Sequence, residues 1–163
     1  QFMNVLEFAI NMELEGEKYY IKQAENNNDN GLKNIFLTLA KDENDHAKIL
    51  QNKSNNLPYE LNNNDTLSET KNLFKGIKDF INEIKQTPEQ LDLYRAALEK
   101  EKESIDLYEK LLSESTDDKS RDLFKFLINQ EKDHYTTLDE LVSQLNKCND
   151  WVESAEFGLR PED

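Results

Sequence analysis

Two sets of carboxylate, phenol and imidazole residues repeat along the chain at a constant offset of 88 positions. The first set is Glu13, Tyr20, Glu43 and His46, and the second is Glu101, Tyr108, Glu131 and His134. Carboxylates and imidazoles bind hard and borderline divalent metal ions. Both histidines of the chain belong to these sets. A solvated acidic face would not keep tyrosines and histidines in register, so the repeat predicts a metal site.

The spacing within each set is typical of helices. Glu43 and His46 are three residues apart, as are their counterparts in the second set, and such residues lie on one face of a helix. Glu13 and Glu101 each lie in an apolar stripe with small residues one turn away, which leaves room for an inward carboxylate. One glutamate from each of two helices, with Glu-x-x-His from two others, is the ligand pattern of di-iron and di-manganese bundles.

The four carboxylates of this pattern would balance the charge of two divalent metal ions. Without metal, buried carboxylates repel one another, and several of them must bind protons. The sequence therefore predicts that metal binding stabilises the fold.

Hydrophobic periodicity predicts an all-α chain with four long helices in two hairpins. The segments are a first hairpin over residues 3–53, a crossover over 54–87, a second hairpin over 88–147 and a tail over 148–163. The expected long helices cover about residues 2–27, Leu32 to Leu50, 88–113 and 117–147. Within the crossover we expect a loop over 52–66 and then a short extra helix, whose apolar stripe is Leu73, Phe74, Ile77, Phe80, Ile81 and Ile84. Thr87 and Pro88 are typical of a helix start.

The repeat extends to apolar positions, since Ala9 matches Ala97 and Phe36 matches Phe124 at the same offset. Two similar hairpins joined by a long crossover predict a single domain over residues 1–163, a four-helix bundle with approximate two-fold symmetry. The crossover must return along the length of the bundle, because the second hairpin has to share one core with the first.

Composition limits the classes of function. The 163 residues are 36% hydrophobic and 33% charged, and the net charge of −14 disfavours nucleic acid and anionic membranes as partners. No apolar run has the length of a membrane span, and the N-terminal stretch is a poor signal peptide. The single cysteine, Cys148, excludes an intrachain disulfide and a Cys-x-x-Cys module. We therefore expect a cytoplasmic location.

The strings that carry the ligands resemble the rubrerythrin branch of the ferritin-like superfamily over about residues 3–147. These strings are ELEGEKYY from Glu13 to Tyr20, DENDH from Asp42 to His46, EKESIDLY from Glu101 to Tyr108, and QEKDH from Gln130 to His134. The resemblance implies a ferritin-like bundle that binds two iron ions, Fe²⁺ or Fe³⁺, with an oxo or hydroxo bridge, and the sequence leaves manganese open. Glu43 and Glu131 resemble the ligands that bridge the two metal ions. Glu13 with His46 would complete the coordination shell of one ion, and Glu101 with His134 that of the other.

The resemblance also implies an activity. Rubrerythrins reduce hydrogen peroxide to water with electrons from a rubredoxin-type four-cysteine iron centre. Because the chain has one cysteine, the electrons must come from a separate donor. Ser104 stands where the best-known members carry a further glutamate, so we expect a more symmetric centre. Related bundles often dimerise, which makes a homodimer the expectation.

Residues around the ligands have predicted supporting roles. By resemblance, Asp42 is the expected partner of His134, and Gln130 that of His46, each accepting from the ring nitrogen that does not bind metal. The alternative for both residues is a solvated helix face. Tyr20 and Tyr108 lie about 10 Å along the helix from the first glutamate of their own set. They are expected to hydrogen-bond a carboxylate on a neighbouring helix and to supply an electron, whereas the alternative is plain core packing.

Some residues of the repeat and of the tail have no predicted chemistry. Asp45 and Asp133 also repeat, but they point away from the adjacent histidine, so surface exposure is expected. The apolar residues of the tail, expected to pack on the bundle or on a second subunit, are Trp151, Val152, Phe157 and Leu159.

Three classes of function remain open from the sequence. The first is a redox enzyme that reduces hydrogen peroxide or dioxygen with electrons from an external carrier. The second is a ferroxidase or iron-handling protein, and the third is a structural bundle with an incidental metal. The oxidant, the electron donor and the oligomeric state are not decided by the sequence.

Overall fold

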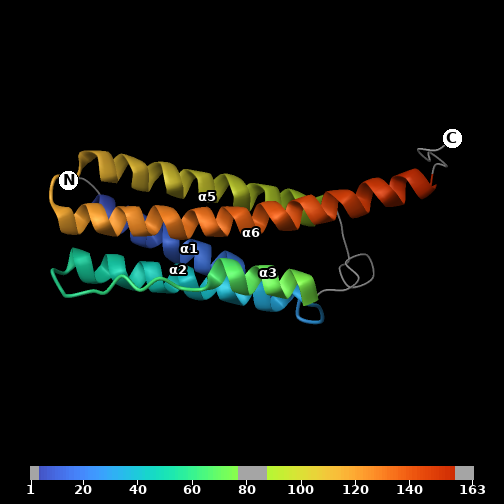
Figure 1. The fold of residues 1–163 in the computed structure, drawn as a ribbon, viewed down its shortest axis with the longest axis horizontal. Helices are drawn as coiled ribbons and strands as arrows, with labels where there is room; N and C mark the ends of the chain where they lie inside the picture. Colours follow the sequence, from blue (N-terminus) through green and yellow to red (C-terminus); the bar gives the residue numbers. More distant parts are fainter. Residues whose placement is uncertain (1–3, 77–87, 157–163) are drawn as a thin grey trace.

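The computed structural model describes residues 4–76 and 88–156, and within these ranges the chain forms helices and no strands. The helices are α1 (Val5–Asn26), α2 (Leu32–Ser54), α3 (Thr66–Gly76), α5 (Pro88–Glu114) and α6 (Asp118–Glu156). The protein is therefore an all-helical bundle, as the periodicity predicts (Figure 1).

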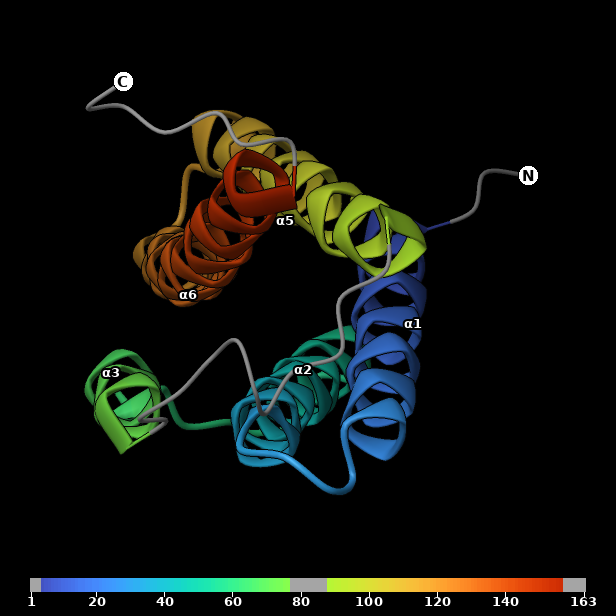
Figure 2. The same cartoon turned by 90° about the vertical axis from the view of Figure 1, so that its right-hand side faces the viewer.

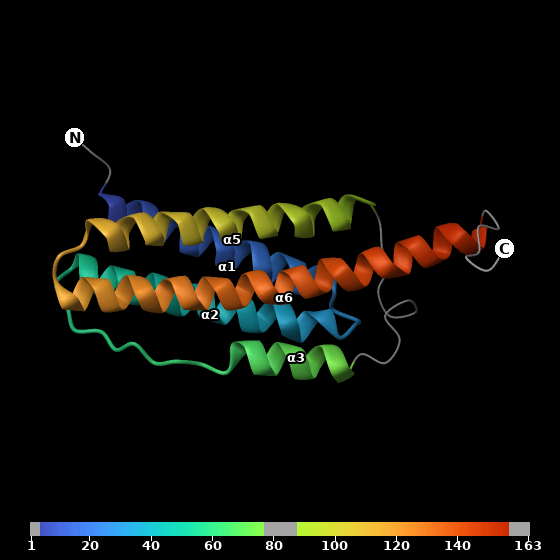
Figure 3. The same ribbon diagram turned by 45° about the horizontal axis from the view of Figure 1, so that its top comes forward.

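Four long helices build the bundle from two antiparallel hairpins, α1 with α2 and α5 with α6 (Figures 1 and 3). After α2 the chain runs back along the bundle to α3, as the sequence requires of a crossover (Figure 3). Viewed end-on, α3 lies outside the four long helices and contacts α2 and α6 (Figure 2). The expected short helix in the crossover is therefore present, and it covers the seam between the two hairpins.

Asparagine and aspartate side chains begin several of the helices. Asn4 Oδ1 accepts from Leu6 N at 2.9 Å at the start of α1, and Asp117 Oδ2 accepts from Ser120 N at 2.9 Å at the start of α6. Each bond satisfies one of the backbone N–H groups that have no partner inside the first turn of a helix. In the Asn-rich connections, Asn30 Oδ1 accepts from Leu32 N at 2.9 Å and Asn64 Oδ1 accepts from Thr66 N at 3.2 Å, so these connections also satisfy backbone N–H groups at helix starts.

The apolar core consists of two clusters, one toward each end of the bundle. One includes Phe36 and Leu138 and the other includes Leu50 and Leu123, all of them buried. Along each long helix, the predicted ligands lie between the residues of the two clusters. Full burial of an aliphatic or aromatic side chain stabilises a fold by about 1.5–3 kcal/mol. The two clusters therefore offset the cost of burying a polar layer between them.

The helix boundaries differ from the prediction at the end of α6. This helix continues to Glu156 rather than ending near residue 147, and its last turns project beyond the other helices (Figures 1 and 3). The physical reason is that no glycine or proline interrupts the chain between residue 148 and Gly158, so each added residue gains a helical hydrogen bond. The segment expected to be a tail is therefore helical over residues 148–156.

Several expectations fall outside the part of the chain that the structure describes. α3 begins at Thr66 and contains Leu73 and Phe74, which are partly buried against the core. The remaining residues of the expected stripe and its flanks, and the side chains of the tail, lie outside the described residues: Ile77, Phe80, Ile81, Ile84, Thr87, Trp151, Val152, Phe157 and Leu159. None of the described helices has the length and apolar character that crossing a membrane requires.

Candidate metal centre

The bundle interior contains two overlapping groups of metal-ligand side chains. In each group the candidate ligand atoms all lie within 4.8 Å of one another. The first group is Glu13, Glu43, His46 and Glu131, and the second is Glu43, Glu101, Glu131 and His134. All six predicted ligands are brought together, and none is more than 4% exposed. Glu43 and Glu131 belong to both groups, which is the placement that carboxylates bridging two metal ions need.

Each group takes ligands from both hairpins. The first has three residues from α1 and α2 and one from α6, and the second has three from α5 and α6 and one from α2. The shared carboxylates Glu43 and Glu131 are therefore the residues that cross from one hairpin to the other. A centre of this kind exists only when the two hairpins are docked.

The two histidine rings point one nitrogen toward the carboxylates. His46 Nδ1 lies 3.0 Å from Glu131 Oε1 and 3.4 Å from Glu13 Oε2. His134 Nδ1 lies 2.8 Å from Glu43 Oε1. Neither Nδ1 atom has the geometry of a hydrogen bond to these oxygens. Nδ1 is thus the ring atom that is available to a metal ion in both halves.

The other ring nitrogen of each histidine faces the outer partner that the resemblance implies. His134 Nε2 lies 2.9 Å from Asp42 Oδ2, and His46 Nε2 lies 3.1 Å from Gln130 Oε1. Because both oxygens accept, Nε2 keeps its proton, and Nδ1 is the nitrogen that can give up its proton to bind metal. Asp42 is buried, and although burial raises its pKa, the hydrogen bond and charge of His134 outweigh burial and lower the pKa below its usual value.

The two tyrosines bond across the hairpins. Tyr20 Oη donates to Glu101 Oε1 at 2.5 Å, and Tyr108 Oη donates to Glu13 Oε1 at 2.6 Å. Burial and the neighbouring carboxylate raise the pKa of each hydroxyl well above its ordinary value, so both remain donors. Each bond occupies one oxygen of a predicted terminal ligand and leaves the other oxygen, Oε2 in both residues, without a hydrogen-bond partner.

Unpaired buried atoms test whether metal ions fit this site. Most of the buried side-chain atoms without a hydrogen-bond partner among the described residues belong to the predicted ligands. These atoms are Glu13 Oε2, Glu43 Oε1, His46 Nδ1, Glu101 Oε2, Glu131 Oε1 and Oε2, and His134 Nδ1. A buried polar group left unsatisfied costs about 1–3 kcal/mol. Since each of the six residues offers at least one unpaired donor atom to a cation, the set fits two divalent ions.

The pKa values of three carboxyl groups of the centre, Glu43, Glu101 and Glu131, are perturbed. Burial raises the pKa of Glu43 and of Glu131 well above the ordinary value, and neighbouring carboxylates add to the rise. Burial acts on Glu101 in the same direction, but the charge of His134 together with hydrogen bonds to His134, Glu131 and Tyr20 outweighs burial and lowers the pKa of Glu101. Without metal, Glu43 and Glu131 therefore bind protons more readily than Glu101 does.

Burial acts on the pKa of the histidines in the opposite direction to its effect on the carboxyl groups. Burial alone would lower the pKa of His46 and His134, because the imidazolium loses its hydration. The charges of the nearby carboxylates, first of all Glu13 for His46 and Glu101 for His134, outweigh burial. Both pKa values lie well above the ordinary value as a result. Metal binding must therefore displace protons from imidazoles as well as from carboxyls.

Two residues of the crossover reach the outer partners of the histidines, and sequence reasoning missed both. Asn64 Nδ2 donates to Asp42 Oδ1 at 3.0 Å and to Gln130 Oε1 at 2.7 Å. Thr66 Oγ1 donates to Asp42 Oδ2 at 2.5 Å. The only sequence signal at Asn64 is its place two residues before a helix start, and that signal predicts a cap rather than a contact with the centre.

The position one turn after the first glutamate differs between the halves. A Cβ atom at Gly16 would lie 2.5 Å from Glu43 Oε2, so glycine leaves the space that this carboxylate occupies. Its counterpart Ser104 is buried, and its hydroxyl lies 3.0 Å from Lys100 O and 3.4 Å from Met12 Sδ. The side chain of Ser104 therefore bonds to its own helix and to α1 rather than to a ligand.

The surface near the centre carries none of the predicted ligands. Asp45 and Asp133, expected to face solvent, are partly buried and belong to neither metal group, and Asp45 pairs with Lys41 at 3.2 Å.

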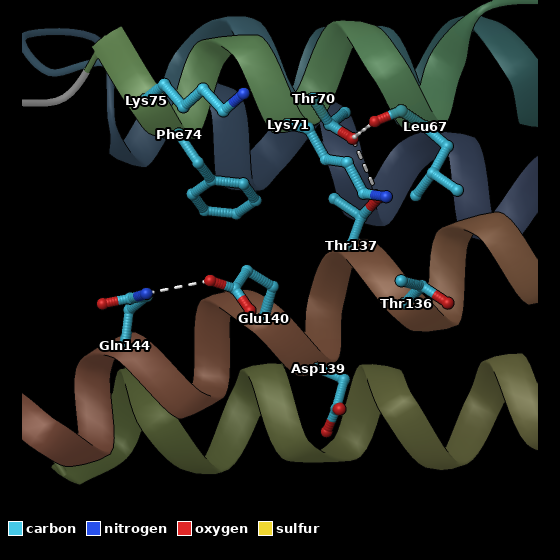
Figure 4. Close-up of a pocket in the computed structure, with 10 residues that line it drawn as sticks. All are labelled: Leu67, Thr70, Lys71, Phe74, Lys75, Thr136, Thr137, Asp139, Glu140 and Gln144. Atoms are coloured by element: carbon cyan, nitrogen blue, oxygen red, sulfur yellow. Dashed lines mark hydrogen bonds between the residues drawn. The ribbon is translucent and has the colours of Figure 1, made fainter.

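A groove of about 440 Å³ runs between α3 and α6, where Thr70 and Thr137 are joined by a 3.0 Å hydrogen bond (Figure 4). The candidate ligands therefore lie inside the bundle and not in this groove.

Comparison with known protein families gives a match over most of the chain. Residues 4–142 match the family model described as Rubrerythrin, and this span includes both ligand groups. The chain matches no curated protein and no solved structure. Since the family model covers the four long helices up to residue 142 and all six ligands, the chain belongs to the rubrerythrin family.

Proposed function

We propose that the protein is a di-iron oxidoreductase that reduces hydrogen peroxide to water and so protects against oxidative stress. The observation that carries the proposal is the pair of buried ligand groups that share Glu43 and Glu131. Membership of the rubrerythrin family supports the same class of chemistry. When bound, two ferrous ions supply the two electrons that, with two protons, convert one hydrogen peroxide to two waters.

The side chains of the chain hold and shape the site for this reaction. His46 and His134 present Nδ1 to the metals because their Nε2 protons are engaged by outer acceptors. Tyr20 and Tyr108 hold one oxygen of each terminal glutamate and so fix the direction of the other. Burial of all six ligands excludes bulk water, which strengthens the electrostatic interactions among the charges inside.

The reducing partner is proposed to be a separate rubredoxin-type electron carrier. The 163 residues contain one cysteine, so they cannot form a four-cysteine iron centre among themselves. The net charge of −14 favours a donor with a basic face and disfavours nucleic acid or an anionic membrane. A cytoplasmic location and a homodimer complete the proposal.

A ferroxidase or iron-handling role is the second candidate. The observation in its favour is the net charge of −14, which raises the local concentration of Fe²⁺ around the protein. In that role dioxygen oxidises the iron, and the iron then leaves the site instead of being reduced again.

Stopped-flow oxidation of the anaerobic diferrous protein separates the two roles. We expect hydrogen peroxide to oxidise the protein faster than dioxygen does, with both irons retained in the chain. Faster oxidation by dioxygen with release of iron would favour the ferroxidase role. The Glu131→Ala variant, which lacks one of the two shared carboxylates, is the control and should react slowly with either oxidant.

A further inference from the structure

The outer partners of the two histidines differ in what they can present to the ring. The carboxylate of Asp42 accepts through either oxygen, so His134 finds an acceptor in every orientation. The side-chain amide of Gln130 has an acceptor at one end and a donor at the other. If this amide turned over, His46 Nε2 would have to accept, and the ring proton would move to Nδ1, the atom that faces the centre.

The tautomer of His46 with its proton on Nδ1 would bind metal more weakly, because this proton would have to move before Nδ1 could act as a ligand. A ring that carries its proton on Nδ1 has no lone pair there, so the metal affinity of the half of the centre that contains His46 would fall. The half that contains His134 does not depend on a side-chain orientation in this way, because either oxygen of Asp42 can accept. The His46 half therefore needs a group that fixes the orientation of Gln130.

Asn64 supplies that group. Its Nδ2 donates both to Gln130 Oε1 at 2.7 Å and to Asp42 Oδ1 at 3.0 Å. At the other end of the same amide, Oδ1 accepts from the backbone N–H of Thr66 at 3.2 Å. A backbone N–H can only donate and a carboxylate can only accept, so the orientation of the Asn64 amide is fixed from both sides.

We infer that Asn64 is a positioning residue that sets the tautomer of His46 through the side-chain amide of Gln130. Asn64 fixes which end of Gln130 faces inward, Gln130 fixes which nitrogen of His46 carries the proton, and the free nitrogen then binds metal. Asn64 belongs to the crossover and is itself exposed, whereas Gln130 is 5% exposed. The inference rests on the metal centre proposed above and not on the choice of oxidant.

The variant that reverses the contact with Gln130 is Asn64→Asp. It also removes the donor to Asp42 Oδ1, but Thr66 Oγ1 still donates to Asp42 Oδ2. The new side chain keeps an oxygen for the N–H of Thr66, so the start of α3 is preserved. It replaces the donor that faces Gln130 with an acceptor. This favours the flipped side-chain amide of Gln130 and therefore the tautomer of His46 that carries its proton on Nδ1. We expect Zn²⁺ affinity to fall about 10–100-fold in the His46 half, the range typical of outer partners, and to change less in the His134 half.

The test uses the Zn²⁺-loaded full chain, because Zn²⁺ is diamagnetic and the chain has only two histidines. Long-range ¹H–¹⁵N NMR of the four ring nitrogens reports which atom binds metal and which carries a proton. In the wild type, both Nδ1 atoms should bind metal. In Asn64→Asp, His46 should lose this signature while His134 keeps it. Asn63→Ala, at the exposed preceding residue, is the matched control and should resemble the wild type.

Rescue separates positioning from a structural effect. Gln130→Glu offers an acceptor in either orientation, so adding Asn64→Ala to it should cost His46 no further Zn²⁺ affinity. Asn64→Ala alone should weaken the His46 half. Equal losses at both histidines, no change in the Asn64 variants, or the same loss with and without Gln130→Glu would overturn the inference. A wild type whose histidines do not bind Zn²⁺ through Nδ1 would contradict the metal centre as well.

Discussion

Removal of metal is expected to lower the thermal midpoint of the protein by about 10 °C, and the loss should grow as the pH rises from about 5.5 to about 8.5. A ligand that binds only the folded state stabilises it by about 4 kcal/mol at a thousand times its dissociation constant. For a chain of this size, each kcal/mol shifts the midpoint by about 2–4 °C. The metal-free protein must instead fold around unpaired ligands.

The sign of the pH effect follows from the direction of the pKa shifts. In the metal-free fold the pKa values of Glu43, Glu131, His46 and His134 are all raised. Above the ordinary values of 4.5 for Glu and 6.5 for His, the folded chain therefore binds more protons than the unfolded chain. Stability then falls as the pH rises. Bound metal replaces these protons, so the metal-loaded protein should not show this fall.

Circular dichroism melts with a chelator and with Mn²⁺, at several pH values, measure the effect. Asp45→Asn is the matched control, because Asp45 repeats in the sequence with the ligands but belongs to neither metal group. Its metal-dependent shift should equal that of the wild type. Midpoints that do not change with chelation at any pH would contradict the metal centre.

The second large effect is expected for Gly16→Ala, which should lower the affinity for both metal ions at least about tenfold, or about 1.4 kcal/mol. The new Cβ atom would lie 2.5 Å from Glu43 Oε2 and 3.3 Å from its Cδ. These atoms are the end of a flexible side chain, so Glu43 can move away and the fold can persist. Because Glu43 belongs to both groups, its displacement weakens both sites at once.

The same substitution should not destabilise the metal-free protein. Alanine is favoured over glycine inside a helix by about 1 kcal/mol, so the free energy of unfolding without metal should stay equal or rise. Ser104→Ala is the matched control at the equivalent position of the second half, where a Cβ atom is already present. Calorimetric titration with Mn²⁺ and urea unfolding of the metal-free forms give the two quantities. If Gly16→Ala bound metal with wild-type affinity, Glu43 would not need the space that the missing Cβ atom of Gly16 leaves.

The sequence predicts which carboxylates and imidazoles meet inside the bundle, because these residues follow two regular patterns. Helical periodicity places Glu43 with His46 on one face, and the offset of 88 positions predicts an equivalent pair on the other hairpin. The resemblance adds the outer partners Asp42 and Gln130, and both lie within hydrogen-bond distance of the expected histidine. Regular helices repeat their geometry, so a contact in one half implies a contact in the other.

The crossover could not be predicted in the same way. Asn64 and Thr66 have no counterpart in the repeat, because only one segment joins the two hairpins. Their contacts with Asp42 depend on the path of the loop and on where α3 lies, neither of which a periodic pattern encodes. The predicted end of the last long helix, near residue 147, was also wrong, since α6 ends at Glu156. Without a glycine or proline to interrupt it, each added residue gains a helical hydrogen bond.

The tyrosine bonds between hairpins have a consequence for how the protein matures. Tyr108 of the second hairpin holds Glu13 of the first, and Tyr20 of the first holds Glu101 of the second. A single hairpin during synthesis offers an ion only one Glu-x-x-His pair and a carboxylate without its tyrosine partner, so we expect it to bind metal weakly. Tight metal binding is therefore expected only after both hairpins have folded and docked.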